Sequence, residues 1–506
     1  MPKPNVILML VDDLGYGDLS CLNEGSKIHT PNIDALSKRG MTFCDAHSTS
    51  ALCTPSRYGL LTGRYNWRST LKSLVLPGGA PPLIEKDRMT MADLFRQNGY
   101  FTACVGKWHL GLEWVRKEFD GSEYGIEEEV APFKGKPGSA FRLDGLDIDY
   151  GEPIAYGPNQ YGFDYFYGTA ASLDQPPYTY IENDRVLKKP DHMTGVFPLD
   201  RGGSSQMDQW QRGPAAQGHD FRQVIPDMNR KVLELIDAHS DEPFFIYYPT
   251  QAVHGPLLPP KEFEGKSGLN AYADMVLYTD YMVGEITAKL KEKGIWEDTV
   301  FLFLSDNGCS GVADYPFLTS NGHNPSYIFR GKKSEIYEGG HRVPAILSWP
   351  GKYRSSKKCS AMVCHSDWFA TFAQMLGAAV PENAGEDSFD LSSLLDGNET
   401  PVRETIVHSS ADGSFSIRDQ KWKLELCSGT GSRMGGPAVP DTGGYQLYDL
   451  NCDIGETENK VDEHPEAVAR LKSKLLEIIE NGRSTPGPKQ ENTPVKAWPQ
   501  YEKLKV

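Results

Sequence analysis

The chain has 506 residues, of which 39% are hydrophobic and 11% aromatic, so it is long enough for two folded domains and too apolar for a disordered chain. Its net charge of −16 excludes the broad basic face of a nucleic-acid-binding protein. A pocket for an anionic ligand would therefore have to be built locally, from a few Lys, Arg and His side chains.

No apolar stretch reaches the roughly 18–20 residues that a membrane span requires. The apolar run at residues 5–11 is short and ends in acids, so it is read as a strand and not as a signal peptide. We expect a periplasmic or secreted protein whose export signal is not part of this sequence. The nine cysteines are scattered without a Cys-x-x-Cys pair, so a structural zinc site is not expected.

Four short apolar runs share one pattern, because each ends in polar residues that suit a binding or catalytic site. Runs of this length, buried on both faces, are typical of parallel strands in an α/β sheet. In chain order they are Val6–Val11 before Asp12 and Asp13, Tyr100–Val105 before Lys107 and His109, Phe244–Tyr248 before His254, and Val300–Leu304 before Asp306 and Asn307.

Helical patterns separate these runs, at Thr90–Asn98, Gln223–Ala238 and Tyr272–Lys293. Alternating strands and helices predict a doubly wound α/β sheet, in which ligands bind beyond the carboxyl ends of the strands. All four polar clusters should therefore meet at one edge of the sheet. The alternative interpretation is that each acid only caps a turn. The presence of four such clusters in one chain weakens that interpretation.

The pattern changes near residue 400, and we predict a catalytic α/β domain over 1–400 and a smaller C-terminal domain over 401–506. Strands are expected at Ser414–Asp419, Lys421–Leu426 and Tyr445–Leu450, and an amphipathic helix at Arg470–Glu480. This predicts a small antiparallel sheet with one helix, followed by an extended tail after Gly482.

The most specific motif is Cys53-Thr54-Pro55-Ser56-Arg57, continued by Leu61-Thr62-Gly63-Arg64. It resembles the signature of type I sulfatases, in which the cysteine is oxidised to formylglycine. The family's other conserved blocks resemble Asn5–Asp18, Gly106–Gly111, Ser305–Gly308, Gly331–Pro344 and Tyr445–Leu450. The arylsulfatase A and N-acetylgalactosamine-6-sulfatase branch is the most similar. The resemblance implies an alkaline-phosphatase-like, mostly parallel sheet sandwiched by helices.

Four residues at two strand ends, Asp12, Asp13, Asp306 and Asn307, offer only oxygen ligands. Such a set suits a hard cation such as Ca²⁺. The resemblance adds an oxygen of formylglycine, derived from Cys53, as a further ligand. A bound cation would lower the pKa of a hydroxyl on the hydrated aldehyde and so prepare the nucleophile.

Cationic and titratable side chains supply the remaining roles. Lys107 and Lys332 are expected to bind the sulfate oxygens, and Arg57 to hydrogen-bond the hydrated aldehyde. His109 and His254 are the candidate proton carriers, because histidine titrates near neutral pH. Similarity to the family makes His254 the acid for the leaving alcohol and His109 the base that regenerates the aldehyde.

The substrate implied by the resemblance is a sulfated carbohydrate, with a sulfated galactose or N-acetylgalactosamine most plausible. Ser172 aligns loosely with a family serine that contacts sulfate. Candidates for the sugar pocket are the aromatic residues of Pro176–Tyr180, Trp67 with Arg68, and His323. These aromatic and polar side chains could equally serve to pack loops. A formylglycine-generating maturation enzyme is the expected protein partner.

Two other functions fit the same motif. A phosphonate or phosphate ester hydrolase of the same superfamily also carries Cys-x-Pro-Ser-Arg, but tends to have Asp-His where this chain has Asp306-Asn307. A non-enzymatic binder of sulfated glycans would keep the pocket while Cys53 stays unmodified. Asn307 favours the sulfatase over the first, and the complete set of catalytic residue types favours it over the second.

Overall fold

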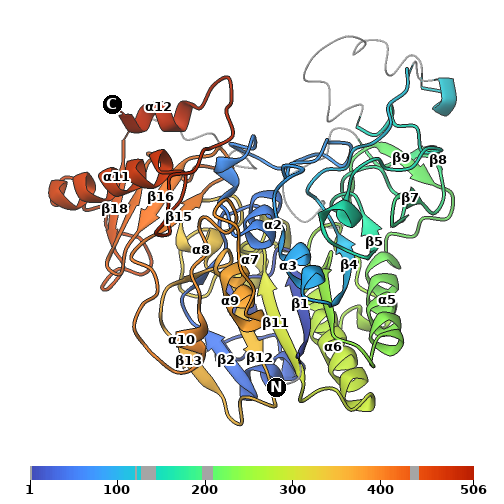
Figure 1. Cartoon of the computed structure of the whole chain (residues 1–506), viewed down its shortest axis with the longest axis horizontal. Coiled ribbons are helices and arrows are strands. Elements are labelled where there is room, and N and C mark those ends of the chain that lie inside the picture. The colour runs from blue at the N-terminus through green and yellow to red at the C-terminus, as the bar shows by residue number, and fades with distance from the viewer. Residues whose placement is uncertain (1–2, 120–121, 127–143, 197–208, 433–443, 506) are drawn as a thin grey trace.

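The computed structural model describes residues 3–119, 122–126, 144–196, 209–432 and 444–505. Its centre is a ten-stranded sheet in the order β13-β2-β12-β11-β1-β10-β4-β5-β6-β7. Helices cover both faces of this sheet (Figure 1). The strands are β1 (Asn5–Val11), β2 (Gly40–Phe43), β4 (Phe101–Lys107), β5 (Tyr165–Thr169), β6 (Ile181–Glu182), β7 (Arg185–Val186), β10 (Phe244–Pro249), β11 (Thr299–Ser305), β12 (Ala345–Ser348) and β13 (Lys357–Cys359).

The four predicted strands are confirmed as the centre of the sheet. They are β11, β1, β10 and β4, which are neighbours in that order and are all parallel. Every residue of β1 is buried, with Val6, Leu8 and Leu10 in one hydrophobic cluster and the alternate residues in another. Burial on both faces explains why this strand is a continuous apolar run and shows no polar alternation. Antiparallel pairing occurs toward the sides of the sheet, for example between β11 and β12.

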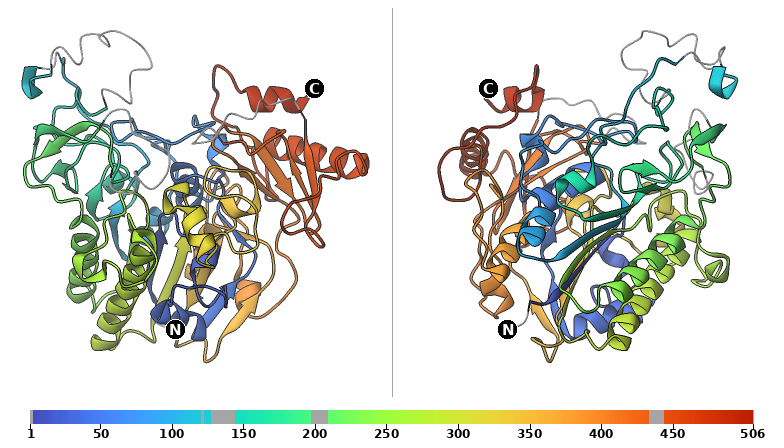
Figure 2. Two further views of the ribbon diagram at one scale, coloured as in Figure 1. Left: turned by 180° about the vertical axis from the view of Figure 1, so that it is seen from behind. Right: turned by 45° about the vertical axis from the view of Figure 1, so that its right-hand side comes forward.

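The three predicted helices are confirmed as α3 (Met91–Gln97), α5 (Val224–Ala238) and α6 (Ala271–Glu292). Thr90 caps α3 through its side-chain oxygen, which accepts a hydrogen bond from the Asp93 N–H. One face of the sheet packs against α5, α6 and α1 (Pro31–Lys38), and the other against α3, α2 (Cys53–Thr62) and α9 (Asp367–Leu376) (Figure 2). The predicted α/β class is therefore correct.

A separate antiparallel sheet contains β15 (Ile406–Ser409), β16 (Phe415–Arg418), β17 (Trp422–Glu425) and β18 (Gln446–Asp449). Three of its strands were predicted and β15 was not. Helix α11 (Pro465–Glu480) packs on this sheet, and its apolar residues share one cluster with those of β15 to β18. The division of the chain at residue 400 remains a prediction.

The segment after Gly482 packs against loop residues Glu386 and Asp387 and against Arg68, as expected for a wrapping tail, and then forms α12 (Pro499–Lys505), which was not predicted. Asp387 anchors it, because this buried carboxylate accepts hydrogen bonds from Arg68 Nε at 2.7 Å and from the Ser484 hydroxyl at 2.8 Å. Within the described part of the chain, no helix is long and apolar enough to cross a membrane.

Candidate functional site

The predicted polar clusters meet at the carboxyl edge of the large sheet, where α2 also begins. Cys53 is the first residue of α2 and is 2% exposed. Extended Leu52 precedes the helix, and Gly63 ends it in the left-handed conformation, with φ of 64°. A side chain at Gly63 would collide with Phe369, which explains the Thr-Gly pair of the motif.

Arg57, one helical turn after Cys53, joins the carboxylates of two strands. Its guanidinium is fully buried and donates to Asp306 Oδ2 at 2.8 Å and to Asp12 Oδ2 at 3.1 Å. A third hydrogen bond goes to the Lys107 carbonyl at 2.9 Å. A planar fork of donors suits this bridging role, so Arg57 holds the ends of β1, β4 and β11 in register.

Two lysines complete the charge balance of the site. Lys107 Nζ lies 2.5 Å from Asp12 Oδ2, and Lys333 Nζ lies 2.6 Å from Asp13 Oδ1. Asn307 donates from Nδ2 to Asp13 Oδ1 at 2.8 Å. Because three buried carboxylates face three buried cations, the protein part of the site is close to neutral, and an added dication would make it attractive to anions.

The arrangement of oxygen atoms fits a bound cation. Asp12 Oδ1 and Asn307 Oδ1 are buried and have no hydrogen-bond partner among the residues that the structure describes, although unpaired buried polar atoms are costly. One ligand atom each of Asp12, Cys53 and Asp306 lies within 4.8 Å of the others. These are hard oxygen donors grouped around residue 53, so the residues present fit Ca²⁺.

The carboxyl groups have unequal proton affinities. Burial alone would raise the pKa of Asp12, but the charges of Lys107, His254 and Arg57 outweigh it and hold that pKa well below the usual range. Burial, reinforced by the charge of Asp12, raises the pKa of Asp306 to about 6. A cation would favour the ionised form of all these groups.

His109 is oriented as a base. Its Nε2 lies 2.8 Å from the Leu76 carbonyl oxygen, which can only accept, so Nε2 carries the proton. Its Nδ1 is buried, has no hydrogen-bond partner in the described part of the chain, and has its lone pair available. Burial and the charges of Lys107 and Arg57 hold the pKa of His109 well below its normal value. The backbone φ of 56° at this non-glycine residue is a strained conformation of the kind found at functional sites.

His254 lies on the loop after β10, close to Asp13. Its Nδ1 is 2.6 Å from the Gly255 carbonyl oxygen, and its Nε2 is 3.8 Å from Asp13 Oδ2. Burial and the charge of Lys333 lower the pKa of His254 to about 4. The loop is placed by β1, because the Asp12 N–H donates to the Ala252 carbonyl at 2.7 Å.

Two predicted site residues lie elsewhere. Lys332 is a surface side chain, 43% exposed, with its Nζ 3.6 Å from Glu335, and the adjacent Lys333 occupies the position beside Asp13. His323 is buried with both ring nitrogens engaged, by Asp18 Oδ1 at 2.8 Å and by the Lys27 N–H at 3.3 Å, so it cannot line a sugar pocket. The consecutive Lys332-Lys333 pair was the only sequence signal for Lys333, and it does not say which lysine points inward.

Ser172 follows β5, so its loop reaches the same edge of the sheet as the other candidates. Gln251 ties this loop to the end of β10, since its Nε2 donates to Thr169 Oγ1 at 2.6 Å and to the Ala171 carbonyl at 2.9 Å. Contact of Ser172 with a sulfate remains a prediction. Trp67 and Arg68 are buried in the packing against the small sheet and the tail, so they do not form a sugar pocket.

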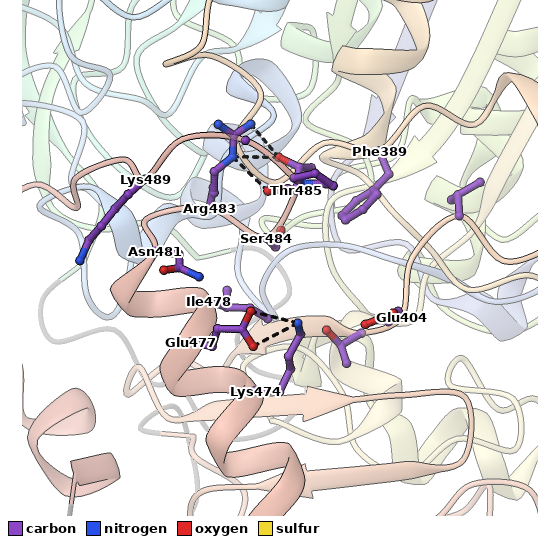
Figure 3. Close-up of a pocket in the computed structure, with 14 residues that line it drawn as sticks. Phe389, Glu404, Lys474, Glu477, Ile478, Asn481, Arg483, Ser484, Thr485 and Lys489 are labelled. Atoms are coloured by element: carbon purple, nitrogen blue, oxygen red, sulfur yellow. Dashed lines mark hydrogen bonds and ion pairs between the residues drawn. The ribbon is translucent and has the colours of Figure 1, made fainter.

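A separate polar cavity of about 490 Å³ lies between the end of α11 and the tail (Figure 3). Arg483 and Thr485 bond to each other on one side, and Lys474 and Glu477 pair on another. None of the candidate catalytic residues lines it. Its mixture of charges and its position on the tail give no reason to connect it with the site around Cys53.

The chain is similar to known sulfatases over most of its length. The family model described as Sulfatase matches residues 4–378. An N-acetylgalactosamine-6-O-sulfatase of Bacteroides thetaiotaomicron is 33% identical, over 94% of this chain and 93% of its own length. Human arylsulfatase A is 28% identical over 96% of this chain and 90% of its own length. A solved structure from work on the metabolism of multiple glycosaminoglycans by Bacteroides thetaiotaomicron superimposes with a TM-score of 0.77 at 32% identity, covering 94% of this chain and 99% of that one.

Proposed function

Because the chain belongs to the sulfatase family and is a sulfuric ester hydrolase, we propose that it hydrolyses the sulfate monoester of a sulfated carbohydrate. The proposed nucleophile is formylglycine, made from Cys53 by a maturation enzyme, and the proposed metal is Ca²⁺ held by Asp12, Asp13, Asp306 and Asn307. The relative named N-acetylgalactosamine-6-O-sulfatase favours a galactose or N-acetylgalactosamine sulfate as the substrate.

The observation that carries this proposal is the group of charges around residue 53. Unpartnered oxygens of Asp12 and Asn307 offer a cation site next to Cys53, and Lys107 and Lys333 lie on its border. When bound, the cation and the hydrated aldehyde supply a hydroxyl that is ionised near neutral pH. The amide oxygen of Asn307, in place of an imidazole, supports a hard cation and so a sulfatase over a phosphonate hydrolase.

The two lysines are proposed to bind the sulfate group. Each donates to a carboxylate of the proposed cation site and has further N–H donors that would bind the peripheral sulfate oxygens. Charge-assisted hydrogen bonds in a buried site stabilise the charge that develops on these oxygens as the ester bond breaks. Arg57 fixes the carboxylates of Asp12 and Asp306, and its hydrogen bond to the hydrated aldehyde remains a prediction.

The two histidines are proposed to carry protons on opposite sides of the reacting ester. His109 would accept a proton at Nδ1, which has no partner while Nε2 donates to Leu76. His254 would donate from Nε2 to the departing alcohol, because Nδ1 is held by the Gly255 carbonyl. The negative sulfate group would favour the protonated His254 that this role requires.

The nucleophile is tested by mass spectrometry of the tryptic peptide containing residue 53, together with Cys53→Ala. We expect the mass of formylglycine in the wild type, and loss of sulfatase activity with an unchanged thermal melt in the variant. Cys364→Ala is the control, since Cys364 is also buried but lies on β14 (Val363–Cys364) against Tyr65 and the small sheet. An active Cys53→Ala enzyme would overturn the proposal, and faster turnover of phosphonate than of sulfate esters would favour the alternative hydrolase.

A further inference from the structure

One carboxylate beside the candidate site has no part in the proposed reaction. Asp174 lies in the turn after β5, and its Oδ1 is 3.9 Å from Nδ1 of His254. The side chain of Asp174 is 21% exposed, but Oδ1 itself is buried and has no hydrogen-bond partner among the residues that the structure describes. A carboxylate oxygen that is buried and unpaired is costly, so this one needs a donor.

The ring of His254 can supply that donor. Its Nε2 lies 3.8 Å from Asp13 Oδ2, so each ring nitrogen faces a different carboxylate. The distance from Nδ1 to Asp174 is about 1 Å longer than a hydrogen bond. Catalytic hydrogen bonds are often long in the absence of substrate and shorten in its complex. A small rotation of either side chain would therefore join Asp174 to His254.

The Gly255 carbonyl oxygen is the other acceptor at this nitrogen, at 2.6 Å from Nδ1. Because Gly255 directly follows His254 in the chain, this contact moves with the histidine's own backbone and does not fix the ring relative to the rest of the site. One N–H can be shared between two acceptors in a three-centre hydrogen bond. The Gly255 contact selects the tautomer, and contact with Asp174, which lies on a different loop, would fix the direction of the ring.

The loop that carries Asp174 is tied to the loop that carries His254. Their strands, β5 and β10, lie on either side of β4 (Figure 1). Gln251, at the end of β10, donates from Nε2 to two oxygens at the end of β5 and just after it, at 2.6 and 2.9 Å. The main-chain carbonyl of Asp174 accepts from the Tyr178 hydroxyl at 3.0 Å and from the Gln211 N–H at 2.9 Å. The carboxylate is therefore presented from a well-anchored backbone.

We propose that Asp174 is a positioning residue for His254, whose carboxylate accepts the Nδ1 proton and holds the ring so that Nε2 points at the oxygen of the departing alcohol. The inference rests on the proposed acid role of His254 and adds the group that orients it. Proton donation requires Nε2 to lie within hydrogen-bond reach of the leaving oxygen. A ring that is misplaced by about 1 Å can lose roughly 10²-fold in rate.

Direct binding of the sugar is the competing explanation for Asp174. A carboxylate accepts hydrogen bonds from sugar hydroxyls, and part of this side chain is exposed. That role would be independent of His254 and would appear mainly in KM. The position of Oδ1 favours the positioning role, because a bound sugar cannot reach an oxygen that is closed to solvent, whereas the imidazole already faces it.

The test is a double-mutant cycle of Asp174→Ala and His254→Ala in the full-length enzyme in saturating Ca²⁺. The quantities measured are kcat and KM for a sulfated monosaccharide and for nitrophenyl sulfate. We expect Asp174→Ala to lower kcat on the sugar sulfate by roughly 10²-fold with little change in KM. Turnover of nitrophenyl sulfate should stay within about twofold, because its leaving group needs no proton. In the His254→Ala background, the same substitution should cost no more than about twofold, since residues that act together are not additive.

Two further variants complete the design. Asp174→Asn keeps the shape of the side chain and one acceptor oxygen, but loses the charge that strengthens the hydrogen bond, so its kcat on the sugar sulfate should fall by only roughly tenfold. Asp184→Ala is the matched control, because it removes an exposed carboxylate from the turn between β6 and β7 and should change neither kcat nor KM. Thermal melts identify the variants that fold, and Asp174→Asn decides the matter if Asp174→Ala does not.

The possible results separate this inference from the function on which it rests. Wild-type kcat on the sugar sulfate in a folded Asp174→Ala or Asp174→Asn enzyme would overturn the positioning role. Losses that multiply in the double variant, or a rise in KM alone, would overturn it too and make Asp174 a sugar-binding residue. In each of these cases a selective loss in His254→Ala would leave the proposed acid in place. Equal losses on both substrates in His254→Ala would remove the acid role and this inference together.

Discussion

Lys332 and Lys333 are neighbours in the sequence with opposite surroundings, so alanine substitutions at the two positions form a matched pair. Lys333 is buried, with its Nζ 2.6 Å from Asp13 Oδ1. The side chain of Lys332 is 43% exposed, and its Nζ makes a looser ion pair with Glu335 Oε1, at 3.6 Å. If Lys333 binds the sulfate group, Lys333→Ala removes one charge-assisted donor from the transition state. Such a loss corresponds to roughly 10²–10³ in kcat, or about 2.7–4 kcal/mol.

Lys332→Ala should change kcat/KM by no more than about twofold, because an exposed ion pair contributes about 0–1 kcal/mol. Lys333→Ala also leaves Asp13 without its buried partner, which costs roughly 3–5 kcal/mol of stability when nothing replaces the charge. Thermal melts should therefore be recorded in saturating Ca²⁺, and activity measured only where the variant is folded.

The assay is kcat and KM for nitrophenyl sulfate and for a sulfated monosaccharide, with Lys333→Arg as a variant that keeps the charge. We expect Lys333→Arg to retain more activity than Lys333→Ala on both substrates. Equal losses in Lys332→Ala and Lys333→Ala would refute the assignment, as would a folded Lys333→Ala enzyme with wild-type kcat.

The remaining predictions concern the metal, the leaving group and acid stability. Chelation should abolish activity and added Ca²⁺ should restore it, since Asp12 and Asn307 each leave a buried oxygen unpaired; full activity in verified metal-free enzyme would contradict this. His254→Ala should lose roughly 10²–10⁴-fold on a sugar sulfate but much less on nitrophenyl sulfate, whose leaving group needs no proton. Equal losses on both would make His254 a binding residue. Burial and the proximity of His47 lower the pKa of His365 to about 3, and both of its ring nitrogens lack partners. Since the unfolded chain binds this proton near pH 6.5, stability should fall as pH drops below that value, by about 2 kcal/mol at pH 5. His365→Leu should reduce this loss in urea unfolding at pH 5 and pH 8 with chelator present, and an unchanged pH dependence would contradict it.

The sequence by itself determined the central strands and the place of the proposed nucleophile, Cys53. Strands β1, β4, β10 and β11 are apolar on both faces, and parallel strands between two helical layers require that pattern. Polar residues directly after such strands must reach the same edge of the sheet, so Asp12, His109 and Asp306 could be placed together without coordinates. The motif from Cys53 to Arg57 could be recognised in the sequence because its residues lie within one helical turn of each other.

Only the tertiary structure decided which side chains point inward from irregular segments. Lys332 and Lys333 lie in a loop where no helical or strand period applies, and the sequence cannot assign direction there. His323 has the right chemistry for a sugar pocket, but its partner Asp18 lies about 300 positions away, and nothing local reveals that pairing.

A buried cluster of three histidines shows even more clearly that the sequence does not reveal contacts between distant segments. His47, His341 and His408 are separated by most of the chain, and none is part of a recognisable metal motif. Their rings contact one another because β3 (Ala46–His47), α8 (Glu338–His341) and β15 pack together. A contact assembled from three distant segments depends on how the sheets pack, and local sequence patterns carry no record of that packing.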